Sequence, residues 1–393
     1  MKVTIRRLRE DDEGRTLQFL KSIFGGWRNV RQWDWKFKEI EKRLGREASN
    51  WVVEDNGKIV GHLAFIPMEL RVGSNIFPVC QLVDGALSPK YRHSGVYTKL
   101  VQRVLLDAKK KGNLAAFGFA NRPSYRIYAS LRDFQTICEI TKMFKILSLR
   151  NAMKTLRVSL SIGELKNNGN DSIVRDLFLI LRKKAILTLI ELIRNTTASA
   201  ITCALGSKPY AVTQAPTMSG VEASVLGEKF PASWLELSKN FMIAFERNSK
   251  YLKWRYINPA ASYKIYAAER SGRLVGYVIT TFEEKSMEIG GARLSGLKVG
   301  YIVDLVAENE VIIPLLLRAE EELRKQQVCF VNCWTTENSF SHDIFRKMRY
   351  YKVPKEIGKI TLVVNFNSPH LQTTISLAQS KDILITLGDS DLV

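Results

Sequence analysis

The sequence has few residues of the kinds that build disulfides or metal sites. Its five cysteines are scattered and odd in number. Cys329 and Cys333 are close in sequence, but no second cysteine pair and no histidine suited to zinc accompanies them. We therefore predict reduced cysteines in the core of a cytoplasmic protein, and no metal. The alternation of Cys329, Val331 and Cys333 is typical of one face of a β-strand.

The sequence also lacks an uncharged apolar run of the roughly 18 residues that can span a bilayer. The apolar stretch 173–193 is broken by the basic residues 182–184. Residues 1–7 have the pattern of a strand followed by charge, which is not that of a signal peptide. We expect a cytoplasmic protein with no transmembrane segment. A helix at 173–194 is favoured as a packing helix between domains, and peripheral membrane contact is the alternative.

A concentrated basic block is missing too, although the net charge is +20. The basic residues are spread along the chain in short runs, such as 109–111, and no recognised nucleic-acid motif accompanies them. Binding of a polyanionic small molecule is sufficient to explain the charge. We expect no specific nucleic-acid partner, only a weak attraction to phosphate-rich molecules at low salt.

What the sequence does have is one stretch, residues 81–100, that reads as a strand, a basic loop and a helix start. Pro89 ends the strand because proline cannot donate to a sheet ladder. The helix is predicted by an apolar row at four-residue spacing, namely Val96, Leu100, Val104 and Ala108. Such a connection points several backbone N–H groups at one place, which attracts phosphate. Arg92 adds positive charge, and Gly95 permits close approach to the backbone.

This stretch resembles the acyl-CoA motif of the GCN5-related N-acetyltransferase (GNAT) family. The family pattern is Arg or Gln, two residues, Gly, one residue, then Gly or Ala. Arg92 and Gly95 match the pattern, whereas Tyr97 stands where the family usually has a small residue. The resemblance implies that acetyl-CoA binds here as a co-substrate. The residues it assigns to that binding are Gly85, Ala86, Leu87, Arg92, His93, Ser94, Gly95, Val96 and Tyr97.

The chain also repeats itself at separations of 215–220 residues. The matching pairs are Trp35-Lys36-Phe37 with Trp254-Arg255-Tyr256, 54–62 with 269–277, Leu82-Val83-Asp84 with Ile302-Val303-Asp304, and Asn121 with Asn338. With the resemblance, this predicts an α/β (α+β) fold of two GNAT-type domains, each a mixed, largely antiparallel sheet flanked by helices. We expect an N-terminal domain at 1–150 with the acyl-CoA motif, a connecting segment with a long helix at 151–220, and a degenerate C-terminal domain at 221–393.

Local patterns predict the elements of each copy. In the first copy the predicted strands are at 2–6, 51–54, 58–65, 82–87, 114–120 and 134–146. The predicted helices are at 12–23 and 123–131, together with the helix that carries the apolar row from Val96 to Ala108. In the second they are helices at 234–248, 313–326 and 341–348, a hairpin around Gly272, strands at 300–306, 328–335 and 360–366, and a strand in the tail at 382–391.

The catalytic candidates follow from the resemblance. The family has Asn followed seven residues later by Tyr, which Asn121 and Tyr128 match, whereas Asn338 is followed by Phe345. In the family that tyrosine commonly protonates the departing CoA thiolate, and a phenol with a pKa of about 10 suits the role. Tyr125 is a neighbouring alternative.

The family polarises the thioester carbonyl with a backbone N–H on the motif strand, which by matching lies near Gly85, Ala86 or Leu87. Gly85 is expected to mark a β-bulge that frees such groups. Asp84 is the nearest candidate base for the amine. Asp304 has the same place in the other copy, which favours a structural or substrate-positioning role for both. The lesser candidate His62 is expected to be a satisfied strand histidine.

The second copy has no Arg-x-x-Gly after its strand, and Glu308 and Glu310 stand where a phosphate would need donors. We expect one active copy that transfers an acetyl group from acetyl-CoA to a primary amine by direct attack. The expected acceptor is a small molecule such as an amino sugar of surface-polysaccharide synthesis. The alternatives are a tandem aminoacyltransferase that uses aminoacyl-tRNA and a non-catalytic acyl-CoA-binding module.

Overall fold

The computed structural model describes residues 3–25, 29–131, 133–148, 151, 217–259, 261–289, 292–353 and 359–391. The helix expected at 173–194 and most of the connecting segment at 151–220 lie outside these residues. None of the described helices is both long enough and apolar enough to cross a membrane.

The N-terminal half is a sheet with helices on both faces. Its strands are β1 (Thr4–Arg7), β2 (Ser49–Asp55), β3 (Lys58–Val72), β4 (Asn75–Leu87) and β5 (Ala115–Asn121). β1 to β4 are antiparallel neighbours, and β5 runs parallel to β4. Its helices are α1 (Glu13–Phe24), α2 (Val30–Trp33), η2 (Asp34–Glu39), α3 (Ile40–Leu44), α4 (Val96–Lys110) and α5 (Arg122–Ser130). The predicted hairpin between β2 and β3 is confirmed, with positive φ angles at Asn56 and Gly57 that suit its tight turn.

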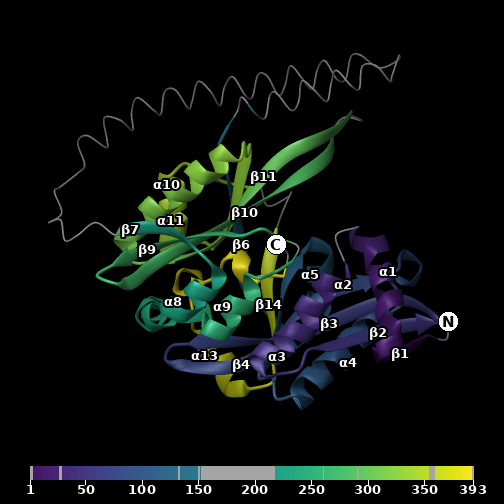
Figure 1. The fold of residues 1–393 in the computed structure, drawn as a ribbon. Coiled ribbons are helices and arrows are strands. Elements are labelled where there is room, and N and C mark those ends of the chain that lie inside the picture. The colour runs from purple at the N-terminus through teal and green to yellow at the C-terminus, as the bar shows by residue number, and fades with distance from the viewer. Residues whose placement is uncertain are drawn as a thin grey trace, which may run out of the picture.

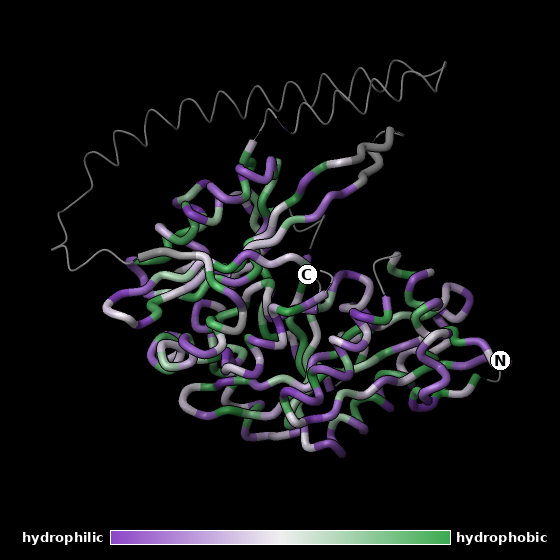
Figure 2. Tube along the Cα trace, in the orientation of Figure 1, coloured by the Kyte–Doolittle hydropathy of each residue, from purple (hydrophilic) through white to green (hydrophobic). Residues whose placement is uncertain are grey.

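The two faces of this sheet have separate cores. The apolar row predicted on α4 is buried against β2, β3 and β5, together with Tyr128 of α5. On the other face, α1, η2 and α3 bury Leu20, Trp35 and Ile40 in a larger core that continues into the C-terminal half. Figure 2 shows apolar segments along the strands inside the molecule.

The C-terminal half, like the N-terminal half, has a run of antiparallel strands followed by one parallel strand. Its strands are β7 (Thr217–Val221), β9 (Lys264–Arg270), β10 (Arg273–Ile289), β11 (Ala292–Ala307) and β12 (Phe330–Thr336). β9 to β11 are antiparallel neighbours, and β12 runs parallel to β11. Its helices are α8 (Ala223–Leu237), α9 (Ser249–Arg255), α10 (Asn309–Lys325), α11 (Phe340–Lys347) and α13 (Pro369–Ser376).

Two predictions for this half are wrong. The helix expected over 234–248 ends at Leu237, and Ile243–Phe245 forms a strand, β8, between β3 and β15. The tail expected as a strand over 382–391 is a strand, β15, only at Ile383–Leu384. It then turns at Leu387–Asp389, where the backbone N–H of Thr386 donates to Asp389. In both places long-range pairing and side-chain bonding override the local pattern.

The two halves exchange strands at their junction. β14 (Ile360–Phe366), late in the chain, pairs with β5 of the N-terminal half, whereas β6 (Phe134–Ile146) pairs with β12 of the C-terminal half. β14 and β6 also pair with each other, so one sheet runs through the molecule in the order β1-β2-β3-β4-β5-β14-β6-β12-β11-β10-β9-β7. Figure 1 shows β14 and the C-terminus between the halves. Each half therefore covers a sheet edge that the other would expose.

The tryptophans of the repeated segments meet at this junction. Trp35 Nε1 donates to the carbonyl oxygen of Trp254, and Trp254 Nε1 donates to that of Trp35, both at 2.9 Å. The rings stack with centroids 5.0 Å apart and an angle of 9° between their planes. The contact between the two segments is reciprocal, as contacts across a two-fold axis are.

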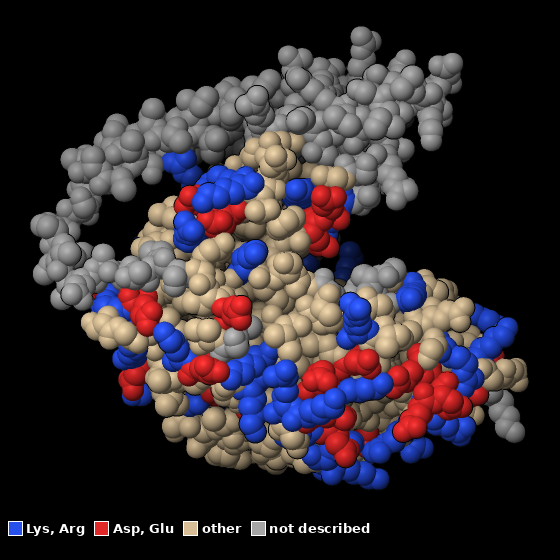
Figure 3. Space-filling view, viewed as in Figure 1, with Lys and Arg blue, Asp and Glu red and all other residues tan. Residues whose placement is uncertain are grey.

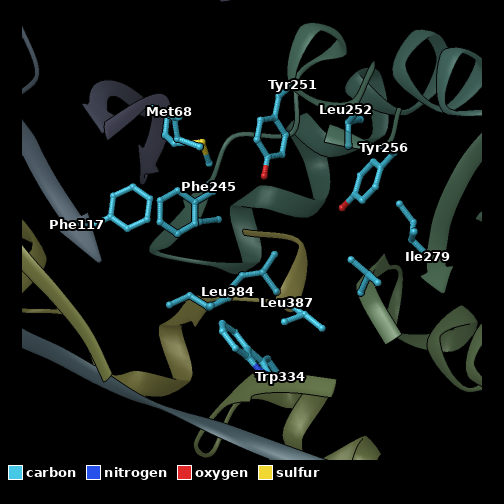
Figure 4. Packing of buried hydrophobic residues seen from close by; sticks show 14 of the residues in the cluster. Met68, Phe117, Phe245, Tyr251, Leu252, Tyr256, Ile279, Trp334, Leu384 and Leu387 are labelled. Carbon is cyan, nitrogen blue, oxygen red and sulfur yellow. The ribbon is translucent and has the colours of Figure 1, made fainter. Parts of the chain in front are cut away.

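The C-terminal tail is part of the core between the halves. Leu384 and Leu387 lie among side chains from both, including Phe117, Phe245 and Trp334 (Figure 4). The rings of Phe117 from β5 and Phe245 from β8 have centroids 4.5 Å apart. The halves are thus packed through a shared apolar core.

We expect Trp35→Ala to lower the free energy of unfolding by about 3–5 kcal/mol, because it leaves a cavity in this core and removes the indole N–H that donates to the carbonyl oxygen of Trp254. Trp254→Ala should cost a similar amount, and the double variant less than the sum, since both lose the same contact. Denaturant unfolding measures this. The exposed Leu235 provides the control, and a comparable loss in Leu235→Ala would contradict the assignment.

Candidate active site

The motif strand β4 carries a bulge at the position expected from Gly85. His62 of β3 pairs with Ala86 and Ala64 pairs with Val83, so Asp84 and Gly85 together oppose Leu63. Asp84 adopts a left-handed backbone with φ of 53°. The bulge re-aims the end of β4 and interrupts its ladder with β3.

β4 and β5 also diverge at this level. Their parallel pairing covers only Val79–Gln81 of β4 and Ala115–Phe117 of β5. Within the described residues, 82–87 of β4 therefore have no ladder partner on the β5 side. This stretch includes Gly85, Ala86 and Leu87, the residues whose backbone the sequence assigned to the thioester. Backbone groups released from a ladder can bind a ligand instead.

The loop after β4 leads into an open helix N-terminus. Gly95 is the N-cap of α4 with φ of 74°, and no described side chain caps the helix there. A Cβ placed on Gly95 would meet no described atom within 4 Å. Arg92, His93, Ser94 and Gly95 are exposed, whereas Val96 is buried under the loop. Uncapped N–H groups and the helix dipole make such an end an anion site.

The loop is held in this shape by Tyr91. Its ring is buried, and its hydroxyl donates to Asp55 Oδ2 in the β2–β3 turn at 2.5 Å. Ser94 Oγ donates to the carbonyl oxygen of Tyr91 at 2.6 Å. A loop fixed before binding loses less entropy when a ligand arrives.

Tyr97 and Tyr128 form a pair over the bulge. A Cβ on Gly85 would lie 2.1 Å from the Tyr97 hydroxyl, so only glycine fits there. That hydroxyl donates to the hydroxyl of Tyr128, whose ring packs against Gly118 and Phe134. Burial raises the pKa of Tyr128 to about 12, while the bond from Tyr97 opposes the rise. The departure of Tyr97 from the family pattern thus brings a second phenol to the site.

Asp84 lies on the opposite side of β4 from this pair. Its Oδ2 is 3.1 Å from Lys36 Nζ, and Lys36 also contacts Asp391 at 2.8 Å. The carbonyl oxygen of Asp84 is 2.9 Å from His62 Nδ1, and Asn50 Oδ1 is 3.1 Å from Nε2. His62 is a buried strand histidine with both ring nitrogens bonded, as expected.

Asn121 and Tyr125 are more exposed than Tyr128. Asn121 Oδ1 accepts from the backbone N–H of Ser124 at 3.1 Å and so caps α5. The hydroxyls of Tyr125 and Thr136 are 3.2 Å apart. The structure therefore brings Tyr128, Tyr97 and Gly85 together and gives Asn121 a helix-capping contact.

Sequence reasoning missed the contact of Lys36 with Asp84 and Asp391. Lys36 was noticed only as part of a repeat, although a lysine between aromatic residues on a predicted buried face was a usable signal. No local pattern joins Lys36 to Asp391, which is 355 residues away.

In the C-terminal half, side chains surround the aspartate at the corresponding bulge. β11 has a bulge at Val303 and Asp304, because Ile279 pairs with Asp304 and Thr280 with Ile302. Asp304 is buried and accepts from a shell of four side chains: Arg247 at 3.2 Å, Tyr256 at 2.8 Å, Tyr277 at 2.7 Å and Thr386 at 3.0 Å. Burial works to raise its pKa, but Arg247 and the hydrogen bonds outweigh burial and lower it.

The phosphate loop is replaced there by carboxylates. β11 ends at Ala307 and α10 begins at Asn309, so one residue connects them. That residue, Glu308, pairs with Arg270 at 2.9 Å, and Glu310 pairs with the same arginine at 3.3 Å. Carboxylates at this helix start occupy the position where an anion would bind.

The fold of the whole chain is that of GNAT proteins. Similar solved structures include N-myristoyltransferase of Saccharomyces cerevisiae with bound myristoyl-CoA, at 10% identity and a TM-score of 0.57, covering 93% of this chain and 83% of that one. A GCN5-related N-acetyltransferase of Anabaena variabilis has 11% identity and a TM-score of 0.55, with coverage of 92% and 72%. A probable N-acyltransferase of Enterococcus faecalis has 10% identity and a TM-score of 0.55, with coverage of 93% and 73%.

The family follows from the sequence of the N-terminal half. Residues 4–131 match the family model described as an acetyltransferase (GNAT) domain. That range runs from β1 to the end of α5 and includes the bulge, the loop and Tyr128. This match confirms the resemblance for residues 4–131, which form a GNAT-type domain. A comparison with curated protein sequences found no match.

Proposed function

We propose that the chain is an acyl-CoA-dependent N-acyltransferase that moves an acetyl group from acetyl-CoA to a primary amine. The observation that carries this proposal is the uncapped N-terminus of α4 directly after the bulged end of β4. It supplies anion-binding N–H groups and a released strand edge side by side. The match of residues 4–131 to the GNAT domain supports the same assignment.

In this proposal the pyrophosphate of CoA binds the backbone from Arg92 to Tyr97. Gly95 fits because its open position allows a phosphate to reach the helix N–H groups. The thioester then lies along Gly85, Ala86 and Leu87, where a backbone N–H polarises its carbonyl. On the face in Figure 3, basic and acidic side chains are interspersed over the N-terminal half, which fits a local anion site better than a long polyanion track.

The chemistry is a direct transfer. The ammonium group of the acceptor first loses one proton to solvent, and the neutral nitrogen bonds to the carbonyl carbon. As the C–S bond breaks, the departing thiolate takes a hydrogen bond from Tyr128, and the second proton, which the attacking nitrogen releases, converts the thiolate to a thiol. Because a thiol has a pKa of about 8.5, full proton transfer from a phenol with a pKa of about 12 is uphill. Tyr128 therefore acts mainly by stabilising the developing negative charge, and Tyr97 strengthens it as a donor.

The C-terminal half, residues 221–393, is in this proposal a degenerate GNAT-like copy of the domain at 1–150, joined to it by 151–220. The reciprocal contact of Trp35 and Trp254 and the equivalent bulges at Asp84 and Asp304 support the duplication. Its shell of side chains around Asp304 has replaced the site. Its remaining role is to complete the sheet and to wall the acceptor side.

The acceptor in this proposal is a small-molecule amine, such as an amino sugar, in the cytoplasm. The purified full chain is incubated with acetyl-CoA and a panel of primary amines, and released CoA thiol is measured. We expect amine-dependent thiol release and a mass increase of one acetyl group on the amine. Because one structural neighbour holds myristoyl-CoA, that thioester is compared directly. Absence of both binding and release with either thioester would overturn the proposal.

A further inference from the structure

A small pocket with a mainly apolar lining lies against the bulge on the side away from the tyrosine pair. It is lined by Leu17, Leu20, Asn29, Gln32, Trp33, Lys36, Phe37 and Asp84. It has room for a group about the size of a water molecule, which is also about the size of an ammonium group. The residues come from α1, from the continuous segment of α2 and η2, and from β4, so three separate segments of the chain build the pocket.

One polar atom at this pocket lacks a partner. Gln32 is buried, with 6% of its surface exposed, and its Oε1 accepts no hydrogen bond from any described residue. Its backbone N–H is used, since it donates to Asn29 Oδ1 at 3.0 Å. A buried carbonyl oxygen left unbonded costs free energy, so a ligand that donates to it binds favourably.

The charge beside the pocket suits a cation. Lys36 Nζ lies 3.1 Å from Asp84 Oδ2 and 2.8 Å from Asp391 Oδ2, so two carboxylates accompany one ammonium group beside the pocket. Lys36 and Asp84 are both buried, where charges interact more strongly than in water. Trp33 and Phe37 both line the pocket, with ring centroids 4.5 Å apart and an angle of 58° between the ring planes, and they add aromatic surface, which attracts cations.

The bulge connects this pocket with the opposite face of the sheet. Asp84 contacts Lys36 on the pocket side, whereas the space at Gly85 is taken by Tyr97 on the α4 side. Neighbouring residues of a strand face opposite sides of a sheet. A group in the pocket is therefore separated from the tyrosine pair only by the backbone of β4, at the level where β4 and β5 have stopped pairing.

We propose that this pocket binds the amino group of the acceptor, with Gln32 Oε1 accepting one of its N–H groups beside the Lys36, Asp84 and Asp391 cluster. The acceptor class is a primary amine that arrives as an ammonium ion, with an apolar or aromatic neighbour to the nitrogen. Its role in turnover rests on the proposed function, but the binding itself does not. Asp391 makes the tail of the degenerate half part of the acceptor site of the active half.

The test is ligand-observed NMR on the full chain with 2-phenylethylamine as the probe and 2-phenylethanol as its uncharged counterpart, with and without saturating CoA. We expect the amine to bind at least about tenfold more tightly than the alcohol, because a hydrogen bond to a charged group is worth that much or more. Gln32→Leu should weaken amine binding about tenfold and alcohol binding less, because a neutral O–H donates a weaker hydrogen bond than an ammonium N–H. Gln32→Glu, which replaces the amide with a carboxylate of the same shape, should keep or increase the affinity for the amine.

The matched control is Gln18→Leu, an exposed glutamine on α1. Equal binding of amine and alcohol to the wild-type chain, or unchanged amine binding in folded Gln32→Leu, would overturn the pocket assignment. Acetyl-CoA binding, measured by calorimetry in the same variants, separates the two proposals. If the chain binds the amine but not acetyl-CoA, the pocket assignment stands and the acyltransferase proposal is rejected. If it binds acetyl-CoA but not the amine, only the pocket assignment is rejected.

Discussion

Gly95→Glu should lower the affinity for acetyl-CoA by about 100-fold or more. The new carboxylate would lie over the uncapped N-terminus of α4, where it competes with phosphate for the N–H groups and repels it. Loss of two charge-assisted hydrogen bonds, at about 1.5 kcal/mol each, corresponds to that factor. Titration calorimetry with acetyl-CoA measures the effect directly, without any assumption about the acceptor.

The control for this variant is at the other end of the same helix. Gly112 has φ of 77° and Gly95 has φ of 74°, and a Cβ at either would meet no described atom within 4 Å. Gly112→Glu therefore introduces the same backbone strain and the same charge far from the loop. We expect wild-type affinity from it. Unchanged binding in Gly95→Glu, or an equal loss in both variants, would show that the phosphate does not bind at this helix start.

Tyr128→Phe should lower kcat by about 100-fold while the affinity for acetyl-CoA stays within about twofold. Acid–base groups contribute roughly 10² to 10⁴ in rate, and the lower end is expected because proton transfer from this phenol is uphill. The ring contacts with Phe134 and Gly118 remain in phenylalanine, so the site keeps its shape. Thiol release at saturating acetyl-CoA and amine measures kcat.

Tyr125→Phe is the matched control, since Tyr125 lies on the same helix and its hydroxyl contacts Thr136 instead of Tyr97. It should keep wild-type kcat. The pH profile gives a second check: with a pKa of about 12, Tyr128 stays protonated up to about pH 11, so its ionisation should cause no loss of rate between pH 6 and 9. Equal kcat in Tyr128→Phe and wild type would remove the donor role.

Much of the site could be read from short stretches of sequence. The stop at Pro89, the loop and the buried row of α4 were predicted within a few residues, because each depends on neighbours along the chain. The strand was predicted at 82–87, and its end is correct, but β4 begins at Asn75. The bulge was predicted from Gly85. The structure adds the reason for a glycine at this position, because the Tyr97 hydroxyl lies where a side chain on residue 85 would be. The tail and the segment 238–248 were mispredicted, since β8 and β15 exist only because strands distant in sequence pair with them.

The sequence by itself predicted the GNAT resemblance of the N-terminal half, the strand, loop and helix start at 81–100, and the lack of an Arg-x-x-Gly pattern after the matching strand of the C-terminal half. These depend on backbone preferences and local charge, which a few adjacent residues specify. Only the tertiary structure decided the exchange of β6 and β14, the stacking of Trp35 on Trp254, and the meeting of Gln32, Lys36 and Asp84 at one pocket, with Asp391 paired to Lys36. Contacts between residues up to 355 positions apart arise from how sheets and cores pack, and no local periodicity encodes them.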